Sequence, residues 1–136
     1  MSVESNRELG RAFFLAQDRL KGGPDPDLCT PDYSAKIGSY PLFDEAGHRA
    51  FAEGFYASFP DLYHTIEDVL AEDDKVAVRF MLHGTHQFEL SGIPPTGRTI
   101  AVQGIAMLET QDGKVAHLDA TFDQIGLMTQ LGVMGA

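Results

Sequence analysis

His86 is the residue whose type and position most favour proton chemistry. It ends an alternating run over residues 76–86, on the side where the other residues are mostly apolar. Because an imidazole gains and loses a proton near neutral pH, a histidine at the rim of an apolar pocket could act as an acid or a base. The alternative role is structural, with the ring hydrogen-bonded to the backbone of the turn over residues 92–98. The sequence leaves both roles open.

Asp119 and Asp123 are the carboxylates that could exchange protons with His86. Asp123 directly precedes a predicted helix over residues 124–131, where a carboxylate accepts amide hydrogen bonds as the N-cap. An acid at a pocket mouth is the other interpretation. Asp119 alternates outward and would enter a pocket only if a β-bulge shifted the register. The catalytic prediction is therefore His86, with Asp119 or Asp123 as its partner.

No metal site is predicted from the sequence. His83 and His86 are three residues apart in a predicted strand, which places them on opposite faces. Cys29 is the single cysteine, so an intramolecular disulfide and a cysteine-based zinc cluster are both excluded.

The strands that would position these groups show as three alternating runs, over residues 76–86, 99–110 and 114–122. The even-numbered positions are apolar in all three, so we expect that face to be covered by helices. Asp112-Gly113 predicts a hairpin turn, and residues 72–75 close a second hairpin.

Helices are predicted at both ends of the chain and between. Apolar spacing, with a capping box from Ser5 to Glu8 and a stop at Gly22, indicates a helix that ends near Leu20. A second helix follows Asp44 as N-cap and runs to Ser58. Helices followed by a meander of strands predict an α+β domain over residues 1–136, with helices on one face of a curved antiparallel sheet.

Five residues are the candidates for contact with a ligand in the predicted core. Phe13 and Phe51 lie on apolar helix faces, where core packing is the alternative. Tyr33 could donate a phenol hydrogen bond to a ligand carbonyl, or satisfy backbone groups at the core edge. Ala106 and Ala120 are small inner-face residues that either let a helix approach or leave space for a ligand.

Composition narrows the class of partner. The chain has 136 residues with 43% hydrophobic content and a formal net charge of −10. A surface this acidic repels phosphate backbones and anionic lipids, so neither nucleic acid nor a membrane surface is an expected partner. The sequence shows no apolar run of the kind found in a secretion signal or a membrane span, so we expect a cytoplasmic protein. The partner expected for it is a small molecule.

A set of short motifs resembles the SnoaL-like polyketide cyclases. They are Phe59-Pro60-Asp61-Leu62, Gly84-Thr85-His86, Gly92-Ile93-Pro94-Pro95-Thr96-Gly97-Arg98, Asp112-Gly113-Lys114-Val115, Asp123-Gln124-Ile125-Gly126-Leu127 and Gln130-Leu131-Gly132. The resemblance implies a cone-shaped α+β barrel, its sheet wrapped around the N-terminal helices and enclosing an apolar pocket. It also implies a homodimer through the outer sheet face, with no metal or organic cofactor.

The resemblance further implies aldol ring closure by a pocket carboxylate that acts as base and then acid. In this chain the corresponding carboxylate and histidine positions hold Ala120 and Ala106, neither of which can move a proton. Two functions therefore stay open. The first is cofactor-free cyclisation, isomerisation or hydration of a hydrophobic, polyketide-like substrate. The alternative is a non-catalytic module that binds a hydrophobic ligand or dimerises.

Overall fold

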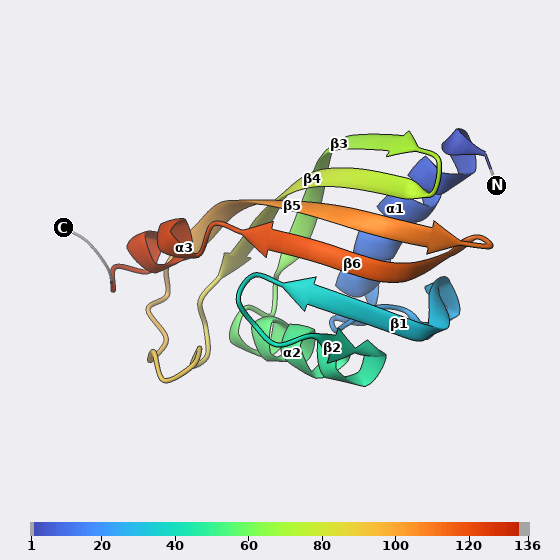
Figure 1. Ribbon diagram of the computed structural model, residues 1–136. Helices are drawn as coiled ribbons and strands as arrows, with labels where there is room; N and C mark the ends of the chain where they lie inside the picture. The colour runs from blue at the N-terminus through green and yellow to red at the C-terminus, as the bar shows by residue number, and fades with distance from the viewer. Residues whose placement is uncertain (1, 134–136) are drawn as a thin grey trace.

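A curved sheet of six strands forms the centre of the molecule (Figure 1). The computed structural model describes residues 2–133. The strands are β1 (Cys29–Ile37), β2 (Phe43–Asp44), β3 (Tyr63–Glu72), β4 (Lys75–Thr85), β5 (Thr99–Gln111) and β6 (Lys114–Phe122). Their order is β2-β1-β6-β5-β4-β3, and the sheet does not close into a complete barrel. The predicted α+β class with a curved sheet is confirmed.

The sheet is antiparallel with one exception. β1 pairs with β6 in parallel, although the sequence predicted an antiparallel sheet. β1 precedes the β3–β6 meander in the chain and joins the sheet beside its last strand, β6, in the same direction. β2 is a two-residue edge strand that pairs antiparallel with β1.

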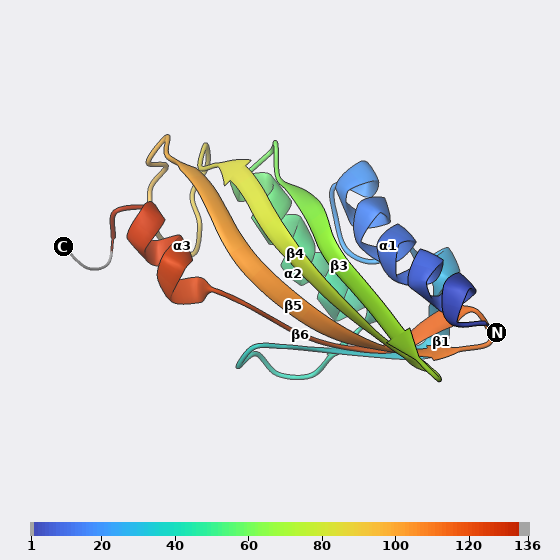
Figure 2. The ribbon, with the colours of Figure 1, turned by 90° about the horizontal axis from the view of Figure 1, so that it is seen from above.

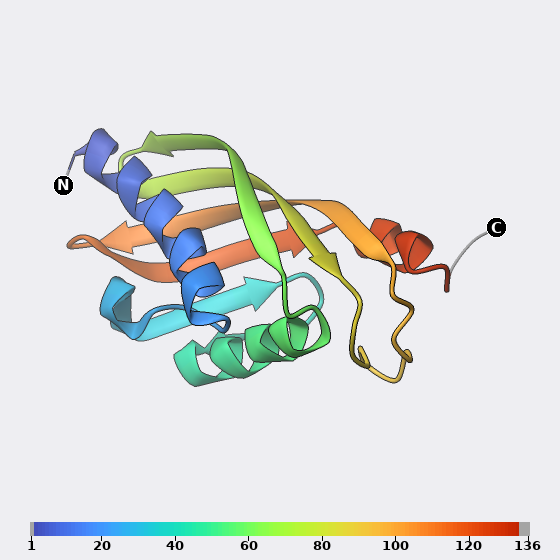
Figure 3. The same cartoon turned by 180° about the vertical axis from the view of Figure 1, so that it is seen from behind.

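Two helices cover the concave face of this sheet, as Figures 2 and 3 show. They are α1 (Val3–Leu20) and α2 (Glu45–Ser58), and a third helix, α3 (Gln124–Gln130), follows β6. α1 contacts β3 and β4, whereas α2 contacts β1 and β2. No helix among the described residues is long and apolar enough to span a membrane.

The helix termini follow local capping signals, and one of them differs from the prediction. Asp44 and Asp123 cap α2 and α3 as predicted, because each side chain accepts a backbone N–H in the first turn. The predicted capping box of α1, from Ser5 to Glu8, is wrong. The observed box joins Ser2 to Ser5, so α1 starts three residues earlier. Its C-cap is Lys21 in the left-handed conformation.

The predicted alternation is confirmed in β4, in β5 and in β6 from Leu118 onward; the odd-numbered Val115 of β6 is buried instead, where the register shifts between Glu109 and Thr110 of β5. Even-numbered residues of β4 and β5 face the helices and are mostly buried, and Ala106 lies directly opposite Ala120 in the ladder. Asp73 and Asp112 have positive φ in the two predicted hairpin turns. Close packing against Phe80 requires glycine at position 104, because a Cβ there would lie 2.4 Å from the ring of Phe80.

Candidate functional site

An apolar cavity of about 90 Å³ lies between the two N-terminal helices and the concave face of the sheet. It is lined by Phe14, Gln17, Ile37, His48, Phe51, Ala52, Phe55, Tyr56, Leu62, His64, Phe80, Leu82, Leu118, Ala120 and Phe122. Only the glutamine, the tyrosine and the two histidines among these side chains carry polar atoms, so chemistry in the cavity depends on those four.

His64 is held at the cavity wall by a carboxylate from α1. The Nδ1 atom of His64 lies 2.8 Å from Oδ1 of Asp18. The backbone N–H of His64 also donates to Oδ2 of Asp18, at 2.8 Å, and the phenol of Tyr56 donates to Oδ1, at 2.6 Å. Asp18 therefore joins α1 to β3 and to α2 through three hydrogen bonds. The imidazole is also packed against the rings of Phe14 and Phe80.

The Asp18 carboxyl stays ionised although it is largely buried. Burial by itself would raise the pKa of Asp18, but the hydrogen bonds from His64 and Tyr56 outweigh it and hold the pKa below the ordinary value. An ionised carboxylate at Nδ1 requires a proton on that nitrogen. In the neutral form of the imidazole, Nε2 of His64 then carries the lone pair. No hydrogen-bond partner for Nε2 is found among residues 2–133.

A second histidine, His48, is paired with a buried phenol. The hydroxyl of Tyr33 lies 2.9 Å from Nδ1 of His48, and the two rings stack at 6.0 Å. Burial lowers the pKa of His48 to about 4 and raises that of Tyr33, so both groups are neutral at pH 7. His48 lines the cavity from α2, whereas Tyr33 supports it from β1.

Gln17 contributes a side-chain amide with an unsatisfied nitrogen. The residue lines the cavity from α1 and is 5% exposed. Within the described part of the chain, its Nε2 has no acceptor. A buried amide nitrogen without a partner is costly, and a ligand with an acceptor oxygen would satisfy it.

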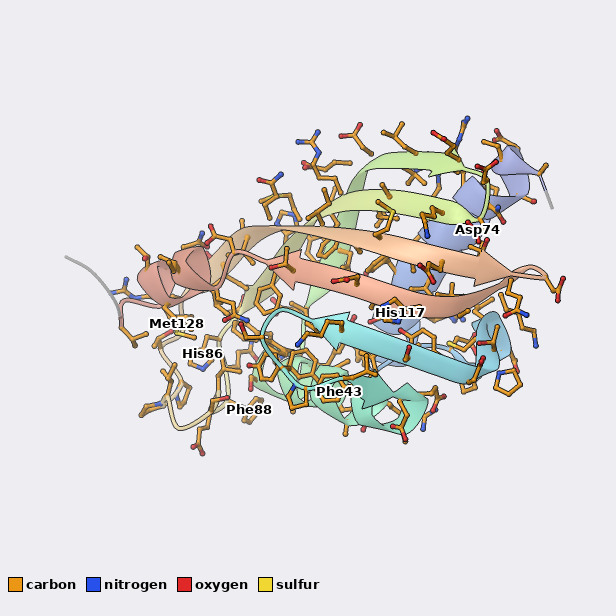
Figure 4. All side chains as sticks on the ribbon, in the orientation of Figure 1. Phe43, Asp74, His86, Phe88, His117 and Met128 are labelled. Carbon is orange, nitrogen blue, oxygen red and sulfur yellow. The ribbon has the colours of Figure 1, made fainter. Side chains whose placement is uncertain are left out.

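His86, the first predicted catalytic residue, does not line this cavity. It is fully buried, its ring stacks on Phe59, and its Nδ1 accepts the backbone N–H of Thr96 at 3.2 Å. Figure 4 shows it at the end of the molecule that carries Met128 of α3, away from His117 on β6. These contacts support the loop between β4 and β5, the structural role that the sequence left open.

The two predicted partner carboxylates also lie away from the cavity. Asp119 is exposed on the outer sheet face, opposite Met107 of β5. The sheet has a register shift between Glu109 and Thr110, but Asp119 still faces outward. Asp123 caps α3, accepting the backbone N–H of Gly126 at 2.8 Å. The structure does not bring His86, Asp119 and Asp123 together, and their catalytic role stays a prediction.

The predicted ligand contacts divide into two groups. Phe51 and Ala120 line the cavity. Phe13, Tyr33 and Ala106 are buried in the core around it and do not line it.

Asp18, His48 and His64 were missed by the sequence analysis. The position of His48 on the buried face of its helix could have been predicted. Together with Ala52 and Tyr56 it forms a stripe at intervals of four residues on a helix with a predicted apolar face. Asp18 lies four residues after Phe14 and so shares its helix face. Nothing local indicates that Asp18 meets His64, because 46 positions separate them.

Metal ligands do not gather in the region that the structure describes: it contains no group of three or more histidine, cysteine, aspartate or glutamate residues placed to hold an ion. Two of the four polar residues in the cavity lining are histidines, and within residues 2–133 the Nε2 atom of each has no hydrogen-bond partner.

A family model for SnoaL-like polyketide cyclases matches residues 25–131. The chain belongs to this family. One curated relative is the aklanonic acid methyl ester cyclase AcmA of Streptomyces galilaeus, 38% identical over 69 residues. The match covers 49% of this chain and 48% of AcmA, so the chain spans about half the length of that relative.

Solved structures extend the similarity over nearly all of the chain. AclR from Streptomyces galilaeus aligns with a TM-score of 0.87 at 26% identity, covering 99% of this chain and 89% of AclR. IdmH from Streptomyces antibioticus aligns with a TM-score of 0.75 at 27% identity, covering 96% of this chain and 97% of IdmH. Within the SnoaL-like family, this chain has Ala106 and Ala120 where the resemblance expects the acid/base pair, and its polar cavity groups come from α1, α2 and β3.

Proposed function

We propose that this SnoaL-like protein is an enzyme that transfers protons within a hydrophobic, polyketide-like substrate, with Nε2 of His64 as the base. One observation carries the proposal: an ionised Asp18 orients His64, and that histidine lines an apolar cavity. A base held by a carboxylate and facing a cavity of low polarity is the arrangement that general acid–base catalysis requires.

Asp18 has two roles in this proposal. It fixes the Nδ1–H tautomer, so that the lone pair of His64 is on Nε2, and it stabilises the imidazolium that forms when Nε2 accepts a proton. Tyr56 supports the carboxylate through its 2.6 Å hydrogen bond, which keeps Asp18 from turning away from the ring. The apolar lining excludes water and strengthens these interactions.

Ring closure by this pair needs no cofactor. Nε2 of His64 removes a proton from a carbon next to a carbonyl, and the C–H electron pair forms the enolate. The enolate carbon attacks a second carbonyl of the same molecule, forming a C–C bond and an alkoxide. The imidazolium then returns its proton to the alkoxide. His64 accepts the proton and later donates it to the alkoxide, so the base is regenerated and the step balances without an oxidant or reductant.

Aklanonic acid methyl ester, the compound in the name of the relative AcmA, is the first substrate to test. We expect wild-type protein in D₂O to accelerate deuterium incorporation next to the ester or ketone carbonyl, or ring closure, as followed by NMR and chromatography. His64→Gln should lower that rate by roughly 10²- to 10⁴-fold, the usual contribution of a general base.

His86→Gln is the matched control, because His86 is a buried histidine outside the cavity. It should retain the rate if the protein stays folded. A loss of rate in His86→Gln with full rate in His64→Gln would overturn the assignment of the base.

The alternative is a non-catalytic binding module, and it is favoured by the two facing alanines, Ala106 and Ala120. The same experiment separates it from the enzyme. Saturable binding of the compound with neither deuterium incorporation nor ring closure above the uncatalysed rate would overturn the enzymatic proposal in favour of the binding module.

We also propose that the protein is a homodimer through the outer sheet face. Ile105 and Met107 are exposed on β5, and Leu70 is exposed on β3. Burial of such a patch against a second copy would remove apolar surface from water.

A further inference from the structure

We propose that His48 of α2, together with Gln17 of α1 in the same cavity lining, binds the carbonyl oxygen of the substrate, and that Tyr33 positions His48 for this role. The substrate class is then a ketone or ester whose carbonyl is next to the C–H bond that His64 deprotonates. The inference rests on the proposed function for its proton-transfer step, but its binding step can be tested without turnover.

The first support is the tautomer that Tyr33 imposes. Tyr33 is buried, and its hydroxyl makes its one observed side-chain hydrogen bond, within the described residues, to Nδ1 of His48 at 2.9 Å. A buried hydroxyl proton without an acceptor costs free energy, so Tyr33 donates and Nδ1 of His48 accepts. The remaining proton of a neutral imidazole is then on Nε2. His48 therefore presents an N–H donor.

The second support is that His48 is neutral. Burial lowers its pKa to about 4, and no carboxylate within residues 2–133 is hydrogen-bonded to it. A neutral imidazole donor binds a carbonyl oxygen without bringing an unpaired charge into the apolar cavity. The parallel stacking of the Tyr33 and His48 rings, at 14° between planes, fixes the direction of the N–H.

The third support is the amide of Gln17. This residue lines the same cavity, is 95% buried, and has a nitrogen without an acceptor among the described residues. A second donor in the wall would complete the binding of one oxygen atom, as paired donors do at sites where negative charge develops.

The two histidines therefore have opposite functions. His64 has an Nε2 lone pair, and His48 has an Nε2–H; both residues line the cavity. When the substrate C–H proton moves to His64, the C–H electron pair becomes the C=C bond of the enolate, and the carbonyl π pair moves to oxygen. That oxygen accepts hydrogen bonds from His48 and Gln17, and His48 keeps its proton throughout.

Acetophenone and ethylbenzene are matched probes for this oxygen site, because they differ by a carbonyl group and have similar apolar parts. We expect wild-type protein to bind acetophenone more tightly, by calorimetry, with the carbonyl stretch of the bound ketone at lower frequency than in hexane. His48→Phe should lower the preference for acetophenone by about tenfold, the worth of one good hydrogen bond, and should reverse part of the frequency shift. An unchanged preference and frequency would overturn the proposal.

Two further variants keep the test decisive if His48→Phe does not fold. Gln17→Met should reduce the preference for acetophenone several-fold with no change for ethylbenzene. Tyr33→Phe should release the His48 tautomer, which ¹⁵N NMR of the imidazole reads directly as a mixture in place of the single Nε2–H form. A single Nδ1–H form in wild-type protein would refute the role of Tyr33.

The controls separate this inference from the proposed function. His64→Gln should lose proton transfer and still prefer acetophenone, whereas Thr121→Ser, an exposed change on the outer sheet face opposite Ile105, should alter neither. Proton transfer that depends on His64 without any preference dependent on His48 would overturn only the oxygen site. A preference for acetophenone that depends on His48, without proton transfer that depends on His64, would overturn only the assignment of His64 as the base.

Discussion

Replacing Asp18 by asparagine tests the most connected polar group of the site. Asp18 accepts three hydrogen bonds, from Nδ1–H of His64, from the backbone N–H of His64 and from the phenol of Tyr56. Asparagine keeps an oxygen that can replace Oδ1. Its NH₂ group, however, takes the place of Oδ2 and points a donor at the backbone N–H of His64.

The expected cost follows from these contacts. Hydrogen bonds to a charged acceptor are worth about 1.5–3 kcal/mol each, and a buried donor left unpaired costs about 1–3 kcal/mol. Asp18→Asn loses one acceptor and the charge at the other two bonds, so we expect the free energy of unfolding at pH 7 to fall by about 2–4 kcal/mol. Tyr56→Phe removes one of these bonds to the charged acceptor and should cost about 1.5–3 kcal/mol.

The stability difference between wild type and Asp18→Asn should also depend on pH, which a simple packing defect would not cause. The pKa of Asp18 is lower in the folded protein than its ordinary value of 3.8. Its ionised contacts therefore contribute stability that is fully present above the unfolded pKa and is lost as pH falls through the folded pKa. The difference between wild type and Asp18→Asn should be largest at neutral pH and should shrink as pH falls below about 4.

Urea titration followed by far-UV circular dichroism measures these differences, since the chain has no tryptophan. Asp119→Asn is the matched control, because this carboxylate is exposed on the same sheet and should change stability by less than about 0.5 kcal/mol. Two results would refute an ionised Asp18 that accepts three hydrogen bonds. One is a loss of unfolding free energy below about 1 kcal/mol in Asp18→Asn, and the other is a loss that is the same at pH 7 and at pH 3.

The remaining predictions concern the ends of the sheet and its outer face. Asp123→Ala should lower the free energy of unfolding by about 0.5–2 kcal/mol, the usual cost of a lost N-cap, in the same urea titration. An unchanged stability would argue against the capping role. In analytical ultracentrifugation at micromolar concentration we expect wild-type protein at the mass of a dimer and Ile105→Glu, at an exposed position on β5, at the mass of a monomer. A monomeric wild type would contradict the proposed homodimer.

The secondary structure was largely predictable because its signals are local. Asp44 and Asp123 each precede a run of helical spacing and cap a helix in the structure, and Asp112-Gly113 forms the tight turn between β5 and β6. The start of α1 was predicted wrongly for an equally local reason. Ser2 and Ser5 are both competent caps, and the first residues extend the helix by nearly a turn once Ser2 takes that role.

The cavity was predictable only in part. The alternation of β5 and β6 assigned Ala120 to the inner face, where it lines the cavity. The same reasoning offered Ala106 and Phe13 as ligand contacts, yet both are packed inside the core. Alternation tells which face a side chain is on, but not whether another side chain or empty space lies opposite it.

The sequence by itself determined the helices, the three long alternating strands with most of their buried faces, and the acidic surface, because periodicity, caps and charge act over a few residues or over the whole chain. The tertiary structure decided which polar groups meet. Asp18 and His64 are brought together by the packing of α1 on β3, and Tyr33 and His48 by the placement of α2 beside β1. Such pairs depend on the relative positions of whole elements, which the pattern within any one element does not contain.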